Sequence, residues 1–169
     1  MRLLIVFILL MSNSFANEAI DIKNLVINKE PKRYDSLTFL DTKNDIINLE
    51  NYDGSLILLN FWATWCLPCK EEMPSLDKLR NNKNLDNLKI FPINVGQENH
   101  EKAKAFFKEL KIKNLEFYFD SKITLAKKFG LRGIPTTILI NKNGFEFARI
   151  IGSIDFNDKK FVEWLSNYN

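Results

Sequence analysis

The chain has 169 residues, of which 46% are hydrophobic and 27% charged, the ordinary balance of one globular domain with a core. Its formal net charge is only +3, and the charges are interspersed along the chain. This composition argues against a protein that holds nucleic acid through bulk positive charge.

The first 16 residues predict an export signal. Arg2 gives a positive start, residues 3–11 are an unbroken apolar run of nine, and Ser14 and Ala16 are small residues at the spacing of a cleavage site. A membrane-spanning helix needs about 20 apolar residues. We therefore predict a signal peptide at residues 1–16 and a periplasmic location, where disulfides can persist. An uncleaved membrane anchor is the alternative.

The next segment, residues 17–35, is polar and interrupted by Pro31, so we predict an N-terminal arm there. Residues 36–169 are predicted to form one domain. That domain opens with residues 37–40 and 46–49, two short apolar segments around a polar turn, which is the pattern of a β-hairpin.

Residues 55–61 are nearly continuously apolar, which is typical of a central strand buried on both faces. They lead into a predicted helix at residues 67–80. After it we expect strands at 88–95, 115–119, 136–140 and 145–151, and helices at 99–110, at 121–129 with Ser121 as its cap, and around Phe161, Trp164, Leu165 and Tyr168. This order predicts an α/β fold, with a mixed central sheet and helices on both faces.

The only two cysteines, Cys66 and Cys69, lie where the predicted central strand gives way to a helix. At a helix N-terminus, free backbone N–H groups and the helix dipole stabilise a thiolate on Cys66. Cys69, one turn later, can close a ring with Cys66 or resolve a mixed disulfide. Pro68 suits the first helical turn, and Trp65 and Leu67 offer an apolar rim for a substrate. The pattern predicts a dithiol–disulfide exchange site.

The cysteine pair allows two other interpretations, a structural disulfide and a metal site. A structural disulfide across four residues would remove little chain entropy. A metal site needs more ligands than two, and we expect the only histidine, His100, to be solvated at a polar helix start. A copper(I) site made by the thiolates of Cys66 and Cys69 stays open, because thiolates suit that ion.

Two further positions bear on this chemistry. Glu72, one turn past Cys69, is a candidate base for the buried thiol; the alternative is that it only favours the helix N-terminus, the role that we assign to Glu71. Residues 133–137 open a later strand with a proline, which strands tolerate at their first position. A cis Pro135 would bring this loop against the cysteines, but the sequence leaves the isomer open.

The segment around the cysteines resembles the WCxxC site of the thioredoxin fold. More of the chain resembles the TlpA/ResA-like branch of exported thioredoxin-like proteins, over residues 60–66, 72–74, 133–137 and 140–144. The resemblance covers roughly residues 31–168. It implies a thioredoxin-like fold with an N-terminal β-hairpin extension.

The resemblance also implies roles. Cys66 would be the nucleophile, Cys69 the resolving thiol, Glu72 the active-site acid and Pro135 a cis proline facing the disulfide. Backbone groups of Ile134 would pair with a bound substrate chain. The implied activity is a protein disulfide reductase, and we expect it to be a monomer that needs no cofactor and no metal. A disulfide-forming oxidant and a copper-delivery protein are the alternatives.

The implied partners are oxidised exported proteins, such as apocytochrome c or copper-site assembly proteins, and a membrane thiol-electron donor of the DsbD or CcdA type. Three departures from relatives stand out. Asn60 takes the place of the buried acid of cytosolic thioredoxins, and Pro92 that of its lysine partner. Thr136 replaces the glutamate common after the cis proline in the cytochrome c maturation thioredoxin. The loss of the buried acid gives Glu72 more weight as the proton acceptor.

Overall fold

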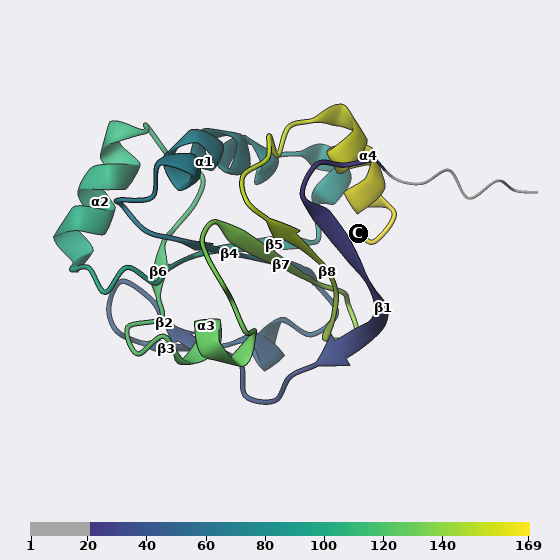
Figure 1. Ribbon diagram of the computed structural model, residues 1–169, viewed down its shortest axis with the longest axis horizontal. Helices are drawn as coiled ribbons and strands as arrows, with labels where there is room; N and C mark the ends of the chain where they lie inside the picture. Colours follow the sequence, from purple (N-terminus) through teal and green to yellow (C-terminus); the bar gives the residue numbers. More distant parts are fainter. Residues whose placement is uncertain (1–20) are drawn as a thin grey trace, which may run out of the picture.

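Residues 21–169 are described by a computed structural model, and they form one mixed sheet of eight strands in the order β1-β8-β7-β4-β5-β6-β2-β3 (Figure 1). The signal peptide predicted at residues 1–16 lies outside the described residues. The strands are β1 (Leu25–Arg33), β2 (Thr38–Leu40), β3 (Ile46–Asn48), β4 (Leu56–Trp62), β5 (Leu88–Asn94), β6 (Tyr118–Phe119), β7 (Thr136–Ile140) and β8 (Phe145–Ile151).

Strand β4 is the centre of the fold, and all seven of its residues are buried. It runs parallel to β5 and antiparallel to β7. Because successive side chains point to opposite faces of a sheet, its residues divide between two cores. Leu56, Leu58 and Trp62 join one cluster, whereas Leu59 and Phe61 join the other. The apolar run predicted to be a central strand therefore serves both faces.

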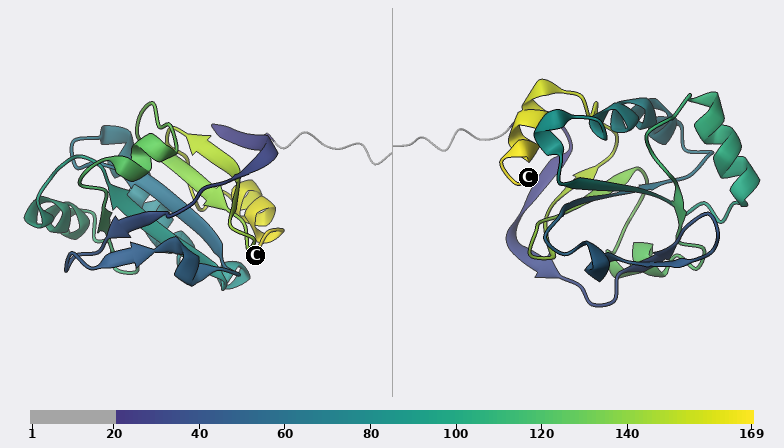
Figure 2. Two further views of the ribbon diagram at one scale, coloured as in Figure 1. Left: turned by 90° about the horizontal axis from the view of Figure 1, so that it is seen from below. Right: turned by 180° about the vertical axis from the view of Figure 1, so that it is seen from behind.

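Helices cover both faces of the sheet (Figure 1). Helices α1, α2 and α4 lie on one face and α3 on the other, and the two turned views agree (Figure 2). On the first face, the Trp62 ring stacks on Phe106 with centroids 4.8 Å apart. The helices are α1 (Leu67–Leu79), α2 (His100–Glu109), α3 (Thr124–Lys128) and α4 (Lys159–Ser166), with short 3-10 turns at Leu49–Tyr52 and Lys83–Leu85. Within residues 21–169, none of these helices is long and apolar enough to cross a membrane.

The predicted fold class is confirmed, including the β2–β3 hairpin at one end of the sheet. The predicted arm is wrong over residues 25–33, which form β1 and pair antiparallel with β8. The register shifts between Ile27 and Lys32, and this irregularity accommodates Pro31, which has no N–H to donate. Most side chains of β1 are exposed, so the strand lacks the apolar alternation by which strands are recognised.

Two predicted elements are shorter than expected. The strand predicted at 115–119 is reduced to Tyr118–Phe119, and the carboxylate of Asp77 accepts the backbone N–H of Leu115 (3.1 Å) instead. Ser121 does not cap the next helix, which begins at Thr124. The Asp120 carboxylate takes that role, accepting the Thr124 hydroxyl (3.1 Å) and the Ala126 N–H (2.8 Å).

Candidate active site

Cys66 and Cys69 form a disulfide at the start of α1, with their Cα atoms 5.3 Å apart. Cys66 is the N-cap of the helix, and its sulfur accepts the backbone N–H of Cys69 at 3.3 Å. Cys66 is 5% exposed and Cys69 fully buried, so an approaching partner reaches Cys66 first. Pro68 lies in the first turn of α1. Trp65 and Leu67 beside the disulfide are 70% and 66% exposed.

The loop before Cys66 is fixed by a carboxylate from a different segment. Glu98 accepts the backbone N–H of Thr64 (3.0 Å) and the side-chain amide of Asn94 (2.8 Å), and the Thr64 hydroxyl donates to its other oxygen. Burial opposes ionisation of Glu98, but these hydrogen bonds outweigh it and lower the pKa of the carboxyl. Glu98 was not among the predicted site residues. The available signal is that the loops after parallel strands β4 and β5 emerge at the same edge of the sheet.

Glu72 is almost fully buried at 2% exposure. Its Oε1 accepts the side-chain amide of Asn60 (2.8 Å), which also donates to the hydroxyl of Thr137 (3.0 Å). Within residues 21–169, Oε2 of Glu72 and the side-chain carbonyl oxygen of Asn60 have no hydrogen-bond partner. Burial raises the pKa of Glu72 from 4.5 to about 7, although Asn60 and the backbone N–H of Ile154 act in the opposite direction. Glu72 is thus placed to bind and release a proton near neutral pH.

The antiparallel pairing of β7 with β4 places the proline loop, residues 133–137, at the end of β4 that leads to Cys66. The Ile134–Pro135 peptide bond is cis, which answers the question that the sequence left open. Two residues after Pro135, Thr137 of β7 lies opposite Asn60 of β4. Pro135 is buried and Ile134 half-buried. On the other side of β4, Pro92 of β5 lies opposite Asn60.

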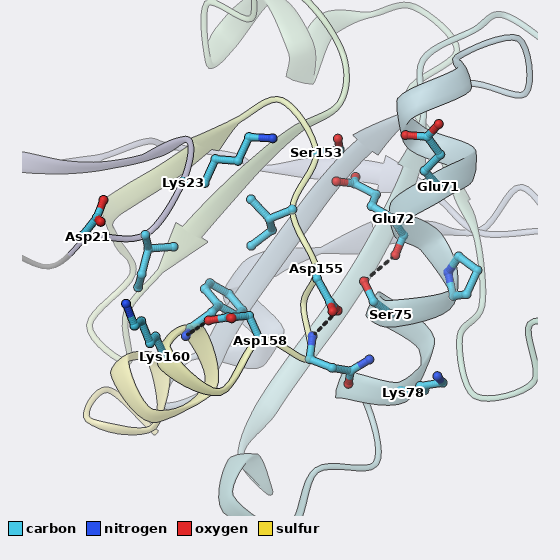
Figure 3. Close-up of a pocket in the computed structure, with 15 residues that line it drawn as sticks. Asp21, Lys23, Glu71, Glu72, Ser75, Lys78, Ser153, Asp155, Asp158 and Lys160 are labelled. Carbon is cyan, nitrogen blue, oxygen red and sulfur yellow. Dashed lines mark hydrogen bonds between the residues drawn. The ribbon is translucent and has the colours of Figure 1, made fainter.

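A cleft of about 750 Å³ opens beside Glu72 (Figure 3). Its walls are α1, residues 21–23, the loop at residues 153–158 and the start of α4. Figure 3 shows the Glu72 carboxylate directed toward Ser153. Ser75 of α1 joins two of the walls, because its hydroxyl donates to the Glu72 carbonyl (2.7 Å) and accepts the N–H of Phe156 (3.0 Å). Although Glu72 lines the cleft, the walls leave it only 2% exposed.

A metal site at the cysteine pair would require further ligands from side chains that the structure places nearby. Within the part of the chain that it describes, no group of three or more His, Cys, Asp or Glu side chains is placed to hold a metal ion. His100 stacks on the ring of Phe119 with centroids 4.3 Å apart and is half-buried. The prediction that His100 is solvated is therefore met in part, since its ring contacts Phe119 but the residue stays partly exposed.

The chain is similar in sequence to known proteins. The profile of the AhpC/TSA family matches residues 31–145. The thiol-disulfide oxidoreductase ResA of Geobacillus thermodenitrificans is 33% identical over 112 residues, which is 66% of this chain and 63% of that protein. The ResA protein of Halalkalibacterium halodurans is 31% identical over 104 residues, 62% of this chain and 58% of that protein. The chain thus spans about three fifths of the length of these curated relatives.

Solved structures agree on the fold. StoA from Bacillus subtilis superimposes with a TM-score of 0.61 and 28% identity, covering 78% of this chain and 94% of that chain. A DsbF homologue from Corynebacterium diphtheriae gives a TM-score of 0.69 at 23% identity, covering 85% and 93%. The resemblance noted in the sequence is therefore confirmed. Because the family profile spans more than half of its 169 residues, the chain belongs to the AhpC/TSA family of thioredoxin-fold proteins.

Proposed function

We propose that the protein is an exported thiol–disulfide oxidoreductase that mainly reduces disulfides of client proteins. One observation carries the proposal: the Cys66 sulfur caps α1 and already accepts the backbone N–H of Cys69. When the disulfide is opened, the same N–H and the positive end of the helix favour a thiolate on Cys66. The names of the ResA relatives as thiol-disulfide oxidoreductases support this activity.

The reaction takes place in two exchanges. The Cys66 thiolate attacks one sulfur of a client disulfide, and the other client sulfur leaves as a thiolate. Glu72 then takes the proton of the Cys69 thiol, and Cys69 attacks the Cys66 sulfur of the mixed disulfide. The Cys66–Cys69 disulfide forms and the second client sulfur is released, so that two electrons pass to the client. A base with a pKa of about 7 is suited to this transfer near neutral pH.

We also propose a class of client and a source of electrons. Trp65 and Leu67 form an exposed apolar rim beside Cys66, and we infer that backbone groups of Ile134 pair with the client chain in β-fashion. We propose as clients exported proteins whose cysteines must be reduced before they take haem or copper. The oxidised protein would be reduced again by a membrane thiol donor of the DsbD or CcdA type. Export itself is supported by the sequence of residues 1–16.

The test is a trapping experiment with Cys69→Ala. Without the resolving thiol, clients stay attached to Cys66 and are identified by mass spectrometry after non-reducing electrophoresis. Cys66→Ala is the matched control, because it keeps one cysteine but lacks the nucleophile. If Cys69→Ala retains no more protein than Cys66→Ala, the proposal is contradicted. The direction of electron flow is tested separately: a reduction potential near about −120 mV would indicate an oxidant, and one well below it a reductant.

A further inference from the structure

Three segments from different parts of the chain meet at Gly152. Its backbone N–H donates to the carbonyl of Pro135 at 2.9 Å, which joins it to the proline loop. Its φ is +100°, and a Cβ built there would lie 3.1 Å from the side-chain nitrogen of Asn24. Asn24 therefore packs directly against the Gly152 backbone, and a larger residue at 152 would disturb that contact.

Asn24 holds this loop through two hydrogen bonds. Its carbonyl accepts the N–H of Ile151 (3.0 Å), and its side-chain amide donates to the carbonyl of Ser153 (2.9 Å). Asn24 itself has a left-handed φ of +63° and closes a turn in which the N–H of Leu25 donates to Ile22. The segment before β1 thus fixes residues 151–153 from outside the central sheet.

The fixed loop continues directly to Glu72. The backbone N–H of Ile154 faces the Glu72 carboxylate, although within residues 21–169 Oε2 of that carboxylate lacks a hydrogen-bond partner. Ser153 and Ile154 line the cleft beside Glu72, and Ile22 and Lys23 line it from the N-terminal side (Figure 3). The turn closed by Asn24 therefore supplies one wall of the cleft and anchors a second.

We propose that Asn24 is a positioning residue for Glu72: by clamping residues 151–153, it keeps the walls of the cleft closed around the carboxyl and so limits the access of water to it. The inference rests on the proposed function in one respect, since the proton of Glu72 matters to turnover only if Cys69 acts as a resolving thiol.

The other charges around the cleft do not favour either state of Glu72 strongly. Three lysines line it, Lys23, Lys78 and Lys160. Four other acidic residues also line it, Asp21, Glu71, Asp155 and Asp158. Because positive and negative side chains line the cleft in similar number, we infer that the walls act on the protonation of Glu72 mainly by controlling the access of water. Burial is indeed the largest influence on the pKa of Glu72, and a loosened wall should bring that pKa back toward its usual value.

The test is Asn24→Gly, since glycine keeps a left-handed backbone without steric cost. The substitution removes the side-chain hydrogen bond and the contact with Gly152 but keeps the backbone hydrogen bond from Ile151. Asn44→Gly is the matched control, because Asn44 has a φ of +67° in the turn between β2 and β3. The Glu72 carboxyl is titrated by NMR with ¹³C-labelled glutamate in the oxidised proteins, whose cysteines do not titrate. Thermal unfolding verifies that both variants are folded.

In Asn24→Gly we expect the titration midpoint of Glu72 to fall by about 0.5 or more, about a threefold change in its protonation equilibrium. Amide hydrogen exchange at Ile154 should become faster in the same variant. Asn44→Gly should change neither quantity. An unchanged midpoint in Asn24→Gly, or an equal shift in Asn44→Gly, would overturn the proposal. Neither measurement requires turnover, so a protein that fails to reduce clients would leave this result interpretable.

Discussion

Replacement of Glu72 by glutamine should make the protein more stable at neutral pH. The carboxyl is 2% exposed and accepts one hydrogen bond, from Asn60. Burial without an opposing charge disfavours its ionised form, which raises its pKa. Glutamine has nearly the same shape, can still accept from Asn60 and is never charged. The substitution therefore removes the cost of burying a negative charge.

The size of the effect follows from the pKa difference between the folded and unfolded chain. A rise from 4.5 to about 7, at about 1.4 kcal/mol for each pH unit, corresponds to about 3 kcal/mol. Because the folded pKa is raised, the contribution of Glu72 to stability is fully present below pH 4.5 and is lost as the pH rises to about 7. The stability of Glu72→Gln relative to the wild type should therefore increase by about 3 kcal/mol across this interval and stay constant above it.

Urea unfolding of the oxidised proteins between pH 4 and 9 measures this difference directly. Other carboxyl groups titrate in the same range, but they do so in both proteins and cancel in the comparison. Glu71→Gln is the control, since Glu71 precedes Glu72 on the same helix and is exposed; it should show no comparable change with pH. A difference between Glu72→Gln and wild type that stays flat with pH would refute the reasoning.

Three further substitutions test other parts of the structure. Arg149→Ala should cost about 3–5 kcal/mol in urea unfolding, because fully buried Glu146 loses the cation that pairs with it; a loss below about 1 kcal/mol would contradict this account. Asp77→Asn should cost about 1–3 kcal/mol in the same assay, since the carboxylate accepts three successive backbone N–H groups at residues 113–115. Trp65→Ala should change stability by less than about 0.5 kcal/mol but slow the reduction of a protein disulfide relative to a small one; equal slowing of both would exclude a docking role for this 70% exposed side chain.

The parts of the fold that were predictable are those with a strong local pattern. Strand β4 is buried on both faces, which gives a continuous apolar run. Helix α2 is buried on one face, which gives apolar residues at helical spacing. Both patterns can be recognised in a short stretch of sequence. Strand β1 was not predictable in this way, because its structure depends on pairing with β8, more than 100 residues later. The short β6 likewise depends on which backbone groups Asp77 occupies.

The same distinction between local patterns and long-range pairing applies to the residues of the candidate site. Cys66, Cys69 and Glu72 are related by helical spacing, which the sequence displays directly. Glu98 and Thr137 are brought to them by the register of β5 and β7 against β4, and no spacing along the chain encodes that register. The raised pKa of Glu72 likewise depends on burial by several segments, so the residue could be named from the sequence but its protonation near neutral pH could not be derived.

Strand β1 has a consequence for the behaviour of the protein in concentrated solution. It lies at one edge of the described sheet, where a strand of another molecule could add to it. Its exposed apolar side chains, Val26 and Ile27, are confined to the first half. In the second half, Pro31 has no N–H to offer and Lys32 and Arg33 are exposed charges. The polar sequence of β1, which lacks the pattern that would predict a strand, therefore also disfavours edge-to-edge association with another molecule.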